Sequence, residues 1–455
     1  MKVLIVSGIW PPDVGGPASH APDVADFLAG RGHEVEVVTT ADAPPPQGAY
    51  RVLAVPRRHR VGVRHYRGAA LVHRRAREAD VVYTTGMFGR SALGSSLART
   101  PYVLKLTGDP AFERSRRRGI VEGDVDQFQG RRGGPAVALL RFARDVELRR
   151  AAHVFTPSAY LRGLALAWGV PPDRVSVVPN PVPSVPDLPD REELRRGFGL
   201  NGATLAFAGR LTAQKALGRA LDAVAAAEEV RFVVAGEGPD REPLEHHARA
   251  LGIAERVTFL GAQPRRRVIE LFRAADATIL SSSWENFPHT VVEALAVGTP
   301  VLAMESGGVG EVVHDGVNGL LVPAAATAQL ASAVQRYFAD DALRERLRAA
   351  AAPSVAAYAP ERVFGCRWRR ASSASGTRSD TSSTSACSPA GTATTTAFIS
   401  RARSLHSTAR RSSRRCPFAS HVSCEISART PCSRRARTRR RPHSPAAGSR
   451  VSTPR

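Results

Sequence analysis

Short apolar segments alternate with helical stretches twice along the first 365 residues of the chain. In the first series, strand-like apolar runs lie at residues 2–9, 34–40, 80–84, 102–106, 153–156 and 175–178. Stretches with apolar residues at helical spacing separate several of them. Alternation of this kind favours a parallel sheet with helices on both of its faces.

A second series of the same kind follows a proline-rich segment. Residues 180–190 contain four prolines, which is typical of a linker. Beyond it, strand-like runs lie at residues 205–208, 232–235, 257–260, 278–281, 300–303 and 319–322, and helical stretches at 216–227, 239–251 and 288–297. We therefore predict two doubly wound α/β domains, residues 1–180 and 181–365, which face each other across a ligand-binding cleft.

Charge and cysteine content set the last 90 residues apart. Of the formal net charge of +23, +17 belongs to residues 366–455, which hold 19 Arg, one Asp and one Glu. All five cysteines lie there too, so disulfides and cysteine-bound metals are excluded from the first 365 residues. The segment also contains 20 Ser and 11 Thr with almost no apolar periodicity, and we expect a disordered basic tail.

This tail fits three interpretations. It is a disordered arm that attracts nucleic acid or anionic lipid, a zinc module, or the product of a shifted reading frame. Its cysteine spacings of 21, 29, 8 and 8 match no zinc-ligand pattern. The first 365 residues use 3 Lys against 42 Arg, which indicates a GC-rich gene, and off-frame GC-rich DNA encodes mainly Arg, Ser, Pro, Ala and Thr. We favour the frameshift, which resequencing across codon 365 would establish.

The chain lacks the patterns of secreted and membrane-spanning proteins. Residues 3–6 are too short for the apolar core of a signal peptide, and the longest charge-free stretch is interrupted by polar residues. We expect a cytoplasmic protein, with peripheral contact at the inner membrane face as an alternative. The basic clusters at residues 57–60 and 114–118 are expected to be solvated surface or, if functional, to bind an anionic acceptor or a lipid surface.

The candidate chemistry is concentrated in residues 283–293, Ser-Trp-Glu-Asn-Phe-Pro-His-Thr-Val-Val-Glu. Pro288 suits the first turn of a helix, so Glu285 is expected in the preceding loop and Glu293 about a turn and a half into the helix. Two carboxylates placed in this way can bind hydroxyls at both ends of a polyhydroxylated ligand. The free N–H groups at the helix start can bind a phosphate.

A turn farther upstream supplies candidate cations. Residues 209–215, Gly-Arg-Leu-Thr-Ala-Gln-Lys, close a strand and open a helix, so Arg210 and Lys215 are expected to reach the same anion. A diphosphate leaving group needs such charges, because its own negative charge grows as the bond breaks. We expect no Asp-x-Asp anywhere in the sequence to hold a divalent ion, so the cations would replace the metal.

In their order and spacing, these motifs resemble the retaining GT-B glycosyltransferases of the glycogen-synthase and bacterial mannosyltransferase kind (glycosyl transferases group 1). The resemblance spans roughly residues 1–365 and implies two facing Rossmann-like domains. It implies a retaining hexosyltransferase that moves a sugar from a nucleotide-diphosphate sugar to an acceptor without a metal. The matching residues are Gly15-Gly16, Gly209-Arg210 with Lys215, Gly236-Glu237-Gly238-Pro239, Glu285 with Glu293, Gly307-Gly308 before Glu311, and Asn318-Gly319-Leu320.

The resemblance also implies roles for the charged residues. Arg210 and Lys215 would bind the donor diphosphate, and Glu293 would bind the nucleotide ribose. Glu285 would contact the donor sugar near the reacting carbon. Retention would follow the family's front-face route, in which the leaving-group oxygen assists deprotonation of the acceptor.

Other implied contacts involve the backbone. The main chain around Asn286 and Phe287 would hold sugar hydroxyls or phosphate. Gly15 and Gly16 would let the first domain approach the phosphate, although a turn needs glycine in any case. The turn at Gly236 is either a plain turn or a nucleotide contact.

The sequence departs from this family at several places, one of them Gly310 before Glu311, where relatives often have Pro. Many relatives have His after the fourth strand of the first domain, where this chain has Leu106-Thr107-Gly108-Asp109, so we expect Asp109 to take over a sugar or acceptor contact. The family's C-terminal helix crosses back onto the first domain. Here the basic tail begins about where that helix should end.

The resemblance implies no cofactor, because the nucleotide-sugar is a co-substrate, and the acceptor would be a sugar, a lipid-linked molecule or a small molecule. Two other functions stay open. A GT-B nucleotide-sugar epimerase would instead use carboxylate and His acid/base groups. A nucleic-acid-binding protein would act through the basic tail, but no basic motif with interleaved aromatic residues in the first 365 residues supports specific nucleic-acid binding.

Overall fold

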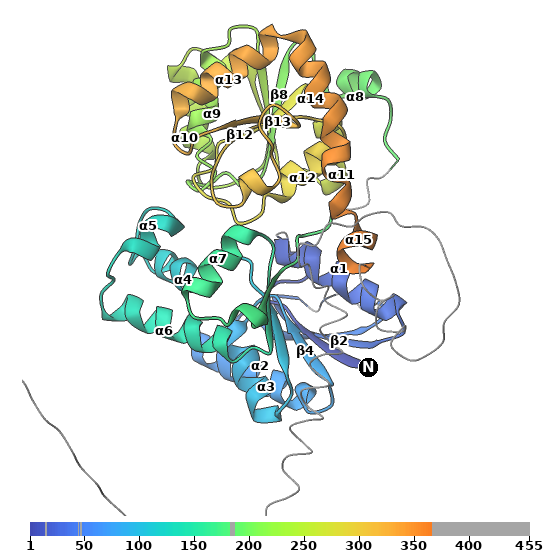
Figure 1. The fold of residues 1–455 in the computed structure, drawn as a ribbon, viewed down its shortest axis with the longest axis vertical. Coiled ribbons are helices and arrows are strands. Elements are labelled where there is room, and N and C mark those ends of the chain that lie inside the picture. Colours follow the sequence, from blue (N-terminus) through green and yellow to red (C-terminus); the bar gives the residue numbers. More distant parts are fainter. Residues whose placement is uncertain (14–15, 44, 46–47, 183–186, 366–455) are drawn as a thin grey trace, which may run out of the picture. The chain divides into compact units, whose positions relative to one another are not determined.

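The computed structural model describes residues 1–365 except for residues 14–15, 44, 46–47 and 183–186. The predictions for the tail, residues 366–455, and for Gly15 therefore lie outside the described residues. Within them, short parallel strands and helices alternate in two series, as the sequence predicts (Figure 1).

The first series builds a seven-stranded parallel sheet in the order β3-β2-β1-β4-β5-β6-β7. Its strands are β1 (Lys2–Val6), β2 (Glu34–Ala41), β3 (Arg51–Pro56), β4 (Val81–Thr84), β5 (Tyr102–Lys105), β6 (His153–Thr156) and β7 (Val175–Val177). Its helices are α1 (Gly16–Gly30), α2 (Val61–Ala76), α3 (Phe88–Ala98), α4 (Pro110–Arg117), α5 (Val125–Gly130), α6 (Pro135–Arg149), α7 (Ala159–Ala167) and the 3-10 turn η1 (Pro172–Arg174).

Alternate residues of the central strand β1 enter two different cores. Val3 and Ile5 pack with residues of α1, whereas Leu4 and Val6 pack with residues of α2 and α3. Successive side chains of a strand point to opposite faces, so a strand that is apolar throughout must be covered by helices on both sides. Burial on both faces of β1 therefore explains the run of apolar residues at the start of the chain.

The second series builds a six-stranded parallel sheet in the order β10-β9-β8-β11-β12-β13. Its strands are β8 (Thr204–Ala208), β9 (Arg231–Ala235), β10 (Val257–Gly261), β11 (Ala277–Leu280), β12 (Val301–Met304) and β13 (Gly319–Val322). Its helices are α8 (Arg191–Phe198), α9 (Gly218–Ala225), α10 (Arg241–Ala250), α11 (Arg265–Ala274), α12 (His289–Ala296), α13 (Thr327–Ala339), α14 (Asp341–Ser354) and α15 (Pro360–Gly365), with 3-10 turns η2 (Ala254–Arg256), η3 (Val309–Glu311) and η4 (Ala356–Tyr358).

The second sheet repeats the two-sided burial of the first. Leu205 and Phe207 of β8 pack with residues of α9 and α13, whereas Ala206 and Ala208 pack with residues of α11 and α12. The prediction of two doubly wound α/β domains is therefore confirmed. Among the described residues, no helix is long and apolar enough to cross a membrane.

Each sheet has one point at which the strand order reverses. In the first sheet β1 lies between β2 and β4, and in the second β8 lies between β9 and β11. The connections leave in opposite directions at such a point, which opens a crevice at the carboxyl ends of the two central strands. The segments that follow β1, β4, β8 and β11 are therefore expected to carry the ligand-binding residues.

Two features of the fold were not expected from the strand pattern. Strand β3 was missed, because its apolar run is short and lies between Arg51 and Pro56. The strand pairs only with β2, at the edge of the sheet. Near the C-terminal end of the described chain, Val363 of α15 joins the core of the first sheet. This return of the chain to the first domain agrees with the expectation from the family resemblance.

Candidate active site

Hydrogen bonds hold the segments that follow β8 and β11 side by side. The backbone N–H of Ser283 donates to the carbonyl of Gln214 at 2.8 Å, and the Gln214 side-chain amide donates to the carbonyl of Trp284 at 3.1 Å. The Ser281 hydroxyl donates to the carbonyl of Lys215 at 3.0 Å. The two motifs that the sequence singled out, about 70 residues apart, thus form one loop cluster at the reversal point of the second sheet.

An ion pair lies within this loop cluster. Lys215 Nζ is 2.5 Å from Glu285 Oε1, and the two side chains are 19% and 8% exposed. Glu285 therefore fixes the position of the Lys215 ammonium. Arg210, in contrast, is exposed and makes no ion pair with any residue that the structure describes. The expected convergence of Arg210 and Lys215 on one anion stays a prediction.

Glycines let the neighbouring loops approach through their backbones alone. A Cβ on Gly236 would lie 1.9 Å from the Gly209 carbonyl oxygen, and one on Gly308 would lie 2.3 Å from the Asn286 carbonyl oxygen. Real Cβ atoms do not approach so closely, so no other residue fits without a backbone shift. These glycines pack the main chain of four loops together around the Lys215–Glu285 pair, whether or not Gly236 also touches a nucleotide.

Glu293 lies on α12 and has its own cation. The helix begins at His289, with Pro288 as the residue before it, so Glu293 lies just over one turn into the helix. Arg265, the first residue of α11, donates from Nη2 to Glu293 Oε1 at 2.9 Å. Burial raises the pKa of Glu293 above its usual value, although Arg265 acts in the opposite direction. Arg265 was not anticipated from the sequence, where its only signal was its place at the start of a helix that follows a strand.

The residues between the two glutamates are tightly held. The side-chain amide of Asn286 donates to the carbonyl of Thr107 at 2.7 Å, and its Oδ1 is buried with no hydrogen-bond partner among the described residues. Phe287 is buried against Tyr358 and His289. The Phe287 side chain is therefore occupied in packing, whereas Asn286 Oδ1 and the backbone of this loop keep hydrogen-bonding capacity for a ligand.

A buried basic cluster close to α12 was not anticipated. Lys105, one of only three lysines in the chain, is fully buried and donates from Nζ to the carbonyl of Val178. Burial lowers the pKa of Lys105 to about 7. Burial also lowers the pKa of His289 to about 4, and the positive charge of Lys105 acts in the same direction. His289 Nε2 lies 2.8 Å from the side-chain amide nitrogen of Asn180.

The structure surrounds Asp109 with protein donors. One carboxylate oxygen accepts the N–H of Ala111 at 2.8 Å and so caps α4. The other accepts from Gln129 at 2.9 Å and from Arg144 at 3.0 Å, and the Asp109 side chain is fully buried. These bonds account for Asp109 as a residue that positions α4. The predicted contact with a sugar or an acceptor needs a rearrangement of this network.

The chain does contain one Asp-x-Asp, Asp124-Val125-Asp126, away from the predicted motifs. Asp124 accepts the N–H of Gln127 at 2.7 Å and caps α5, and Asp126 accepts the hydroxyl of Tyr160 at 2.6 Å. Among the described residues, no group of three or more His, Cys, Asp and Glu side chains is arranged to hold a metal ion. Metal-free chemistry stays a prediction.

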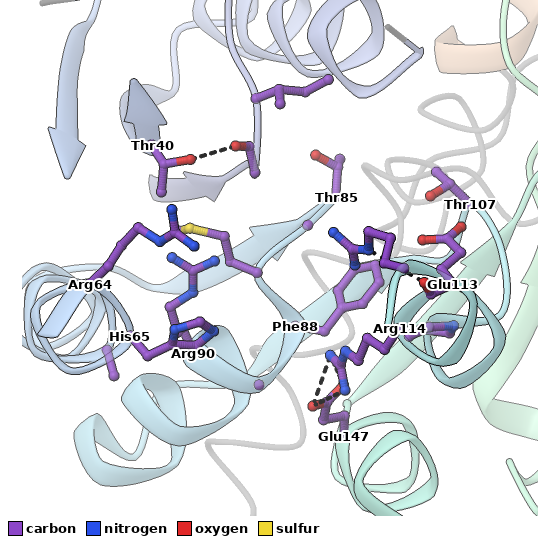
Figure 2. A pocket seen from close by; sticks show the side chains of 18 of the residues that line it. Thr40, Arg64, His65, Thr85, Phe88, Arg90, Thr107, Glu113, Arg114 and Glu147 are labelled. Carbon is purple, nitrogen blue, oxygen red and sulfur yellow. Dashed lines mark hydrogen bonds and ion pairs between the residues drawn. The ribbon is translucent and has the colours of Figure 1, made fainter. Parts of the chain in front are cut away.

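A basic cavity of about 1170 Å³ opens at the reversal point of the first sheet. Figure 2 shows arginine side chains from α2, α3 and α4 around it. Gly8 and Ile9 after β1 and Thr85 to Gly89 after β4 line its floor, and Arg210 is its one lining residue from the second domain. Seven arginines and two glutamates line it: Arg57, Arg64, Arg90, Arg114, Arg117, Arg118, Arg210, Glu113 and Glu147.

The two basic clusters predicted from the sequence contribute to this cavity, but their leading members are neutralised. Arg57 pairs with Asp13 and, at 3.1 Å, with Asp42. Arg114 pairs with Glu147 at 3.1 Å, as the dashed lines in Figure 2 indicate. Of these two clusters, only Arg117 and Arg118 line the cavity without a carboxylate partner among the described residues.

Two protein-family models match the chain. The Glycosyl transferase 4-like domain matches residues 15–181, and the Glycosyl transferases group 1 model matches residues 190–353. The gap between the two matches falls on the proline-rich segment. The family model of the second domain covers all residues of the loop cluster around Lys215 and Glu285.

Three relatives match this chain over most of their length. The D-inositol 3-phosphate glycosyltransferase of Xylanimonas cellulosilytica is 32% identical over 398 residues, which cover 80% of this chain and 90% of the relative. The enzyme of the same name from Acidothermus cellulolyticus is 31% identical and covers 74% of this chain and 80% of its own. An uncharacterized glycosyltransferase of Methanocaldococcus jannaschii is 27% identical, with 76% and 91% covered.

Solved structures share the fold at lower identity. Sucrose-phosphate synthase from Thermosynechococcus elongatus superposes with a TM-score of 0.69 at 18% identity, over 82% of this chain and 100% of that one. Anabaena HepE, solved in complex with UDP-glucose, gives a TM-score of 0.65 at 22% identity, over 82% and 99%. The chain therefore belongs to the glycosyl transferases group 1 family and is a nucleotide-sugar glycosyltransferase with the GT-B fold.

Proposed function

We propose that this enzyme transfers a hexose from a nucleotide-diphosphate sugar with retention of the anomeric configuration and without a metal ion. The observation that carries the proposal is the Lys215–Glu285 pair at the reversal point of the second sheet. This ion pair places a fixed cation and a fixed carboxylate in direct contact, close enough to bind the diphosphate and the sugar of one donor. The Lys215 ammonium can stabilise the departing diphosphate, and the Glu285 carboxylate can accept a hydrogen bond from a hexose hydroxyl.

The cations stabilise the leaving group. In the proposed complex Lys215 and Arg210 contact the diphosphate, and the free N–H groups at the start of α12 add to their effect. Such groups stabilise the transition state more than the bound donor, because the negative charge on the diphosphate increases as the glycosidic bond breaks. This arrangement can supply the charge that a divalent ion supplies in other transferases.

The nucleoside is proposed to bind farther along α12. The Glu293 carboxylate accepts hydrogen bonds from the ribose hydroxyls, and Arg265 holds that carboxylate in place. Because burial favours the neutral form of Glu293, the Arg265 contact helps to keep the group ionised and able to accept.

The proposed stereochemistry is supported by the hydrogen bonds of one candidate base. Asp109, the carboxylate that the sequence suggested on the acceptor side, is buried and committed to Ala111, Gln129 and Arg144. In a front-face reaction no protein base is needed. The bond from the anomeric carbon to the diphosphate oxygen breaks, the acceptor oxygen bonds to the same face, and its proton passes to the departing phosphate oxygen.

Relatives support a polyol acceptor. The curated enzymes that match over most of the chain carry the name D-inositol 3-phosphate glycosyltransferase. We propose a hydroxylated small molecule or its lipid-linked form as the acceptor, bound in the first domain, and a cytoplasmic location where nucleotide-sugars are available. The epimerase and nucleic-acid alternatives have no such support from the family match.

The test is a donor screen with the full chain in the presence of EDTA. Nucleotide-sugars that carry different bases and sugars are assayed for hydrolysis and for transfer to polyol acceptors, and the anomeric configuration of the product is read by NMR. Retained configuration with EDTA present supports the proposal. Inverted product, activity that depends on an added divalent ion, or an epimerised donor would each contradict it.

A further inference from the structure

The positive charge of the first-domain cavity is not evenly compensated. Arg57 and Arg114 have carboxylate partners in Asp13, Asp42 and Glu147. Within the described part of the chain, Arg64 and Arg90 have none. The one side-chain hydrogen bond described for Arg64 donates to the neutral backbone carbonyl of Arg57, at 3.3 Å. Arg117, Arg118 and Arg210 also line the cavity without a carboxylate partner among the described residues, and Arg64 and Arg90 carry the uncompensated charge on the side of α2 and α3.

Arg90 is the less solvated of the two. Its Nη1 is buried and has no hydrogen-bond partner among the residues that the structure describes. Burial, followed by the positive charges of Arg64 and Arg114, lowers the pKa of Arg90 to about 10. Buried cations are normally paired, because removing a charge from water without a partner is energetically costly. An unpaired guanidinium in a cavity wall is therefore a group that gains strongly from an incoming anion.

The backbone of α2 makes room for this side chain. A Cβ on Gly68 would lie 2.7 Å from Arg90 Cδ and 3.3 Å from its Nη1. Because Gly68 has no side chain, the Arg90 stem crosses α2 closely and its head reaches the cavity. In Figure 2 the head groups of Arg64 and Arg90 lie next to each other in the cavity, below Thr40. Phe88 and Gly89, at the start of the eleven-residue helix α3, line the same space.

We propose that Arg64 and Arg90 form an anion subsite that binds a phosphate group carried by the acceptor. The proposal rests on the transferase function proposed above and names the substrate class of its acceptor. Guanidinium groups bind phosphate oxygens in pairs, and charge-assisted bonds of this kind are among the strongest that side chains make. The N–H groups at the start of α3 add to the attraction.

The position of the subsite favours the acceptor over the donor. The donor loops follow β8, β9, β11 and β12, whereas the cavity floor follows β1 and β4 of the other sheet. Arg210, proposed to contact the donor diphosphate, also lines the cavity. An acceptor anchored by its phosphate at Arg90 therefore occupies a space that continues to the leaving group.

The phosphate can come from a soluble phosphomonoester or from a lipid headgroup. Two apolar lining residues at this cavity are solvent-exposed, Tyr66 at 76% and Leu93 at 54%. An exposed apolar rim beside a basic pocket suits a lipid phosphate, but a polyol phosphate makes the same contacts with the arginines. The chemistry at Arg64 and Arg90 is shared, and the experiments separate the two sources.

Phosphate binding tests the subsite without any turnover. Inorganic phosphate is titrated into the full chain by calorimetry and thermal unfolding, with Arg90→Met, Arg64→Ala and, as a matched control, Arg74→Ala on the exposed side of α2. We expect wild type and Arg74→Ala to be stabilised equally and the other two to lose the response. The basic tail is present in all four proteins, so any phosphate that it binds contributes equally to each measurement. An equal response in all four would overturn the proposal, and Arg90→Gln, which removes the charge but keeps a polar head group, serves if Arg90→Met does not fold.

Kinetics then tests the link to the acceptor. Two acceptors that differ only by a phosphomonoester are compared at saturating donor. Arg90→Met should raise the KM for the phosphorylated acceptor on the order of tenfold to a hundredfold, as expected for the loss of hydrogen bonds to a charged group. It should leave the KM for the donor and for the unphosphorylated acceptor unchanged. Equal preference of the wild type for both acceptors would contradict the inference.

Failure of the inference and failure of the proposed function remain distinguishable. If phosphate binds at Arg90 but no nucleotide-sugar is hydrolysed or transferred, the transferase proposal fails while the subsite stands. If the donor turns over but neither arginine affects phosphate binding, the subsite alone fails. For the source, flotation with phosphatidylcholine vesicles is compared with and without phosphatidic acid. Recruitment that depends on Arg90 identifies a lipid phosphate, and its absence together with binding of inorganic phosphate identifies a soluble one.

Discussion

Lys215 Nζ contacts Glu285 Oε1 at 2.5 Å across 70 residues of intervening sequence. The contact joins the segments that follow two adjacent parallel strands, β8 and β11. It orders both side chains before any donor arrives, so less conformational entropy is lost on binding. Preorganisation of this kind is what makes a fixed charge effective against a developing one.

The first prediction concerns this pair. Lys215→Ala removes a positive charge aimed at the leaving diphosphate, and we expect kcat to fall roughly a hundredfold to a thousandfold, as for other lost transition-state contacts. Steady-state kinetics on the preferred donor measures it. Arg266→Ala, which removes an exposed arginine paired with Glu270, should leave kcat unchanged. A Lys215→Ala enzyme with wild-type kcat would remove Lys215 from the mechanism.

The second prediction concerns the nucleoside contact. Glu293→Gln should weaken binding of the free nucleoside diphosphate, and Arg265→Ala should weaken it in the same direction because it releases the carboxylate. Since burial raises the pKa of Glu293, affinity should also decline on acidification at a pH above the usual carboxyl range. Calorimetry at several pH values measures both effects. Glu293→Gln should abolish this pH dependence, and a Gln variant that keeps it would assign the titration to another group.

The third prediction concerns stability and pH. His289 has a pKa of about 4 in the folded state against 6.5 in the unfolded chain, so the unfolded state binds the extra proton between these values. The free energy of unfolding should therefore fall by about 2 kcal/mol between pH 7 and pH 5 on account of this group. His289→Gln should flatten that part of the profile. Chemical denaturation measures it, with the exposed His314→Gln as control; equal slopes in both variants would refute the assignment.

The fourth prediction concerns the backbone contacts of the donor loops. Gly236→Ala places a methyl group 1.9 Å from the Gly209 carbonyl oxygen, so the loops must separate. We expect a loss of about 3 kcal/mol in unfolding free energy, the upper end for overpacked sites, together with loss of donor binding. Gly163→Ala, in the middle of α7 with nothing within 4 Å of the added atom, should instead stabilise by up to about 1 kcal/mol. Wild-type donor affinity in Gly236→Ala would show that the close approach is dispensable.

Patterns of apolar residues along the sequence predicted the buried strands of both sheets. Strands that are apolar on both faces, such as β1 and β8, were found because double-sided burial leaves no polar residue in the run. The meeting of Lys215 and Glu285 was also foreseeable, since parallel strands end at one edge. The edge strand β3 was missed, because a strand that pairs with β2 alone needs only a short apolar run.

Pairings between distant side chains could not be predicted in this way. Nothing near Arg265 in the sequence indicates Glu293, and nothing near Asp109 indicates Arg144, because both partners are brought together by packing of separate helices. The arginine clusters were judged by their density along the chain. The structure distinguishes their members by which head groups have a carboxylate within reach: Arg57 and Arg114 do, whereas Arg117 and Arg118 have none among the described residues.

The four loops around the Lys215–Glu285 pair touch through main-chain atoms at Gly236 and Gly308, and this limits how the enzyme can diversify. Atoms common to every amino acid carry no information about one sugar or one base. Variation in donor choice within such a scaffold must therefore come from residues on the outer sides of these loops, while the geometry around the scissile bond is inherited unchanged.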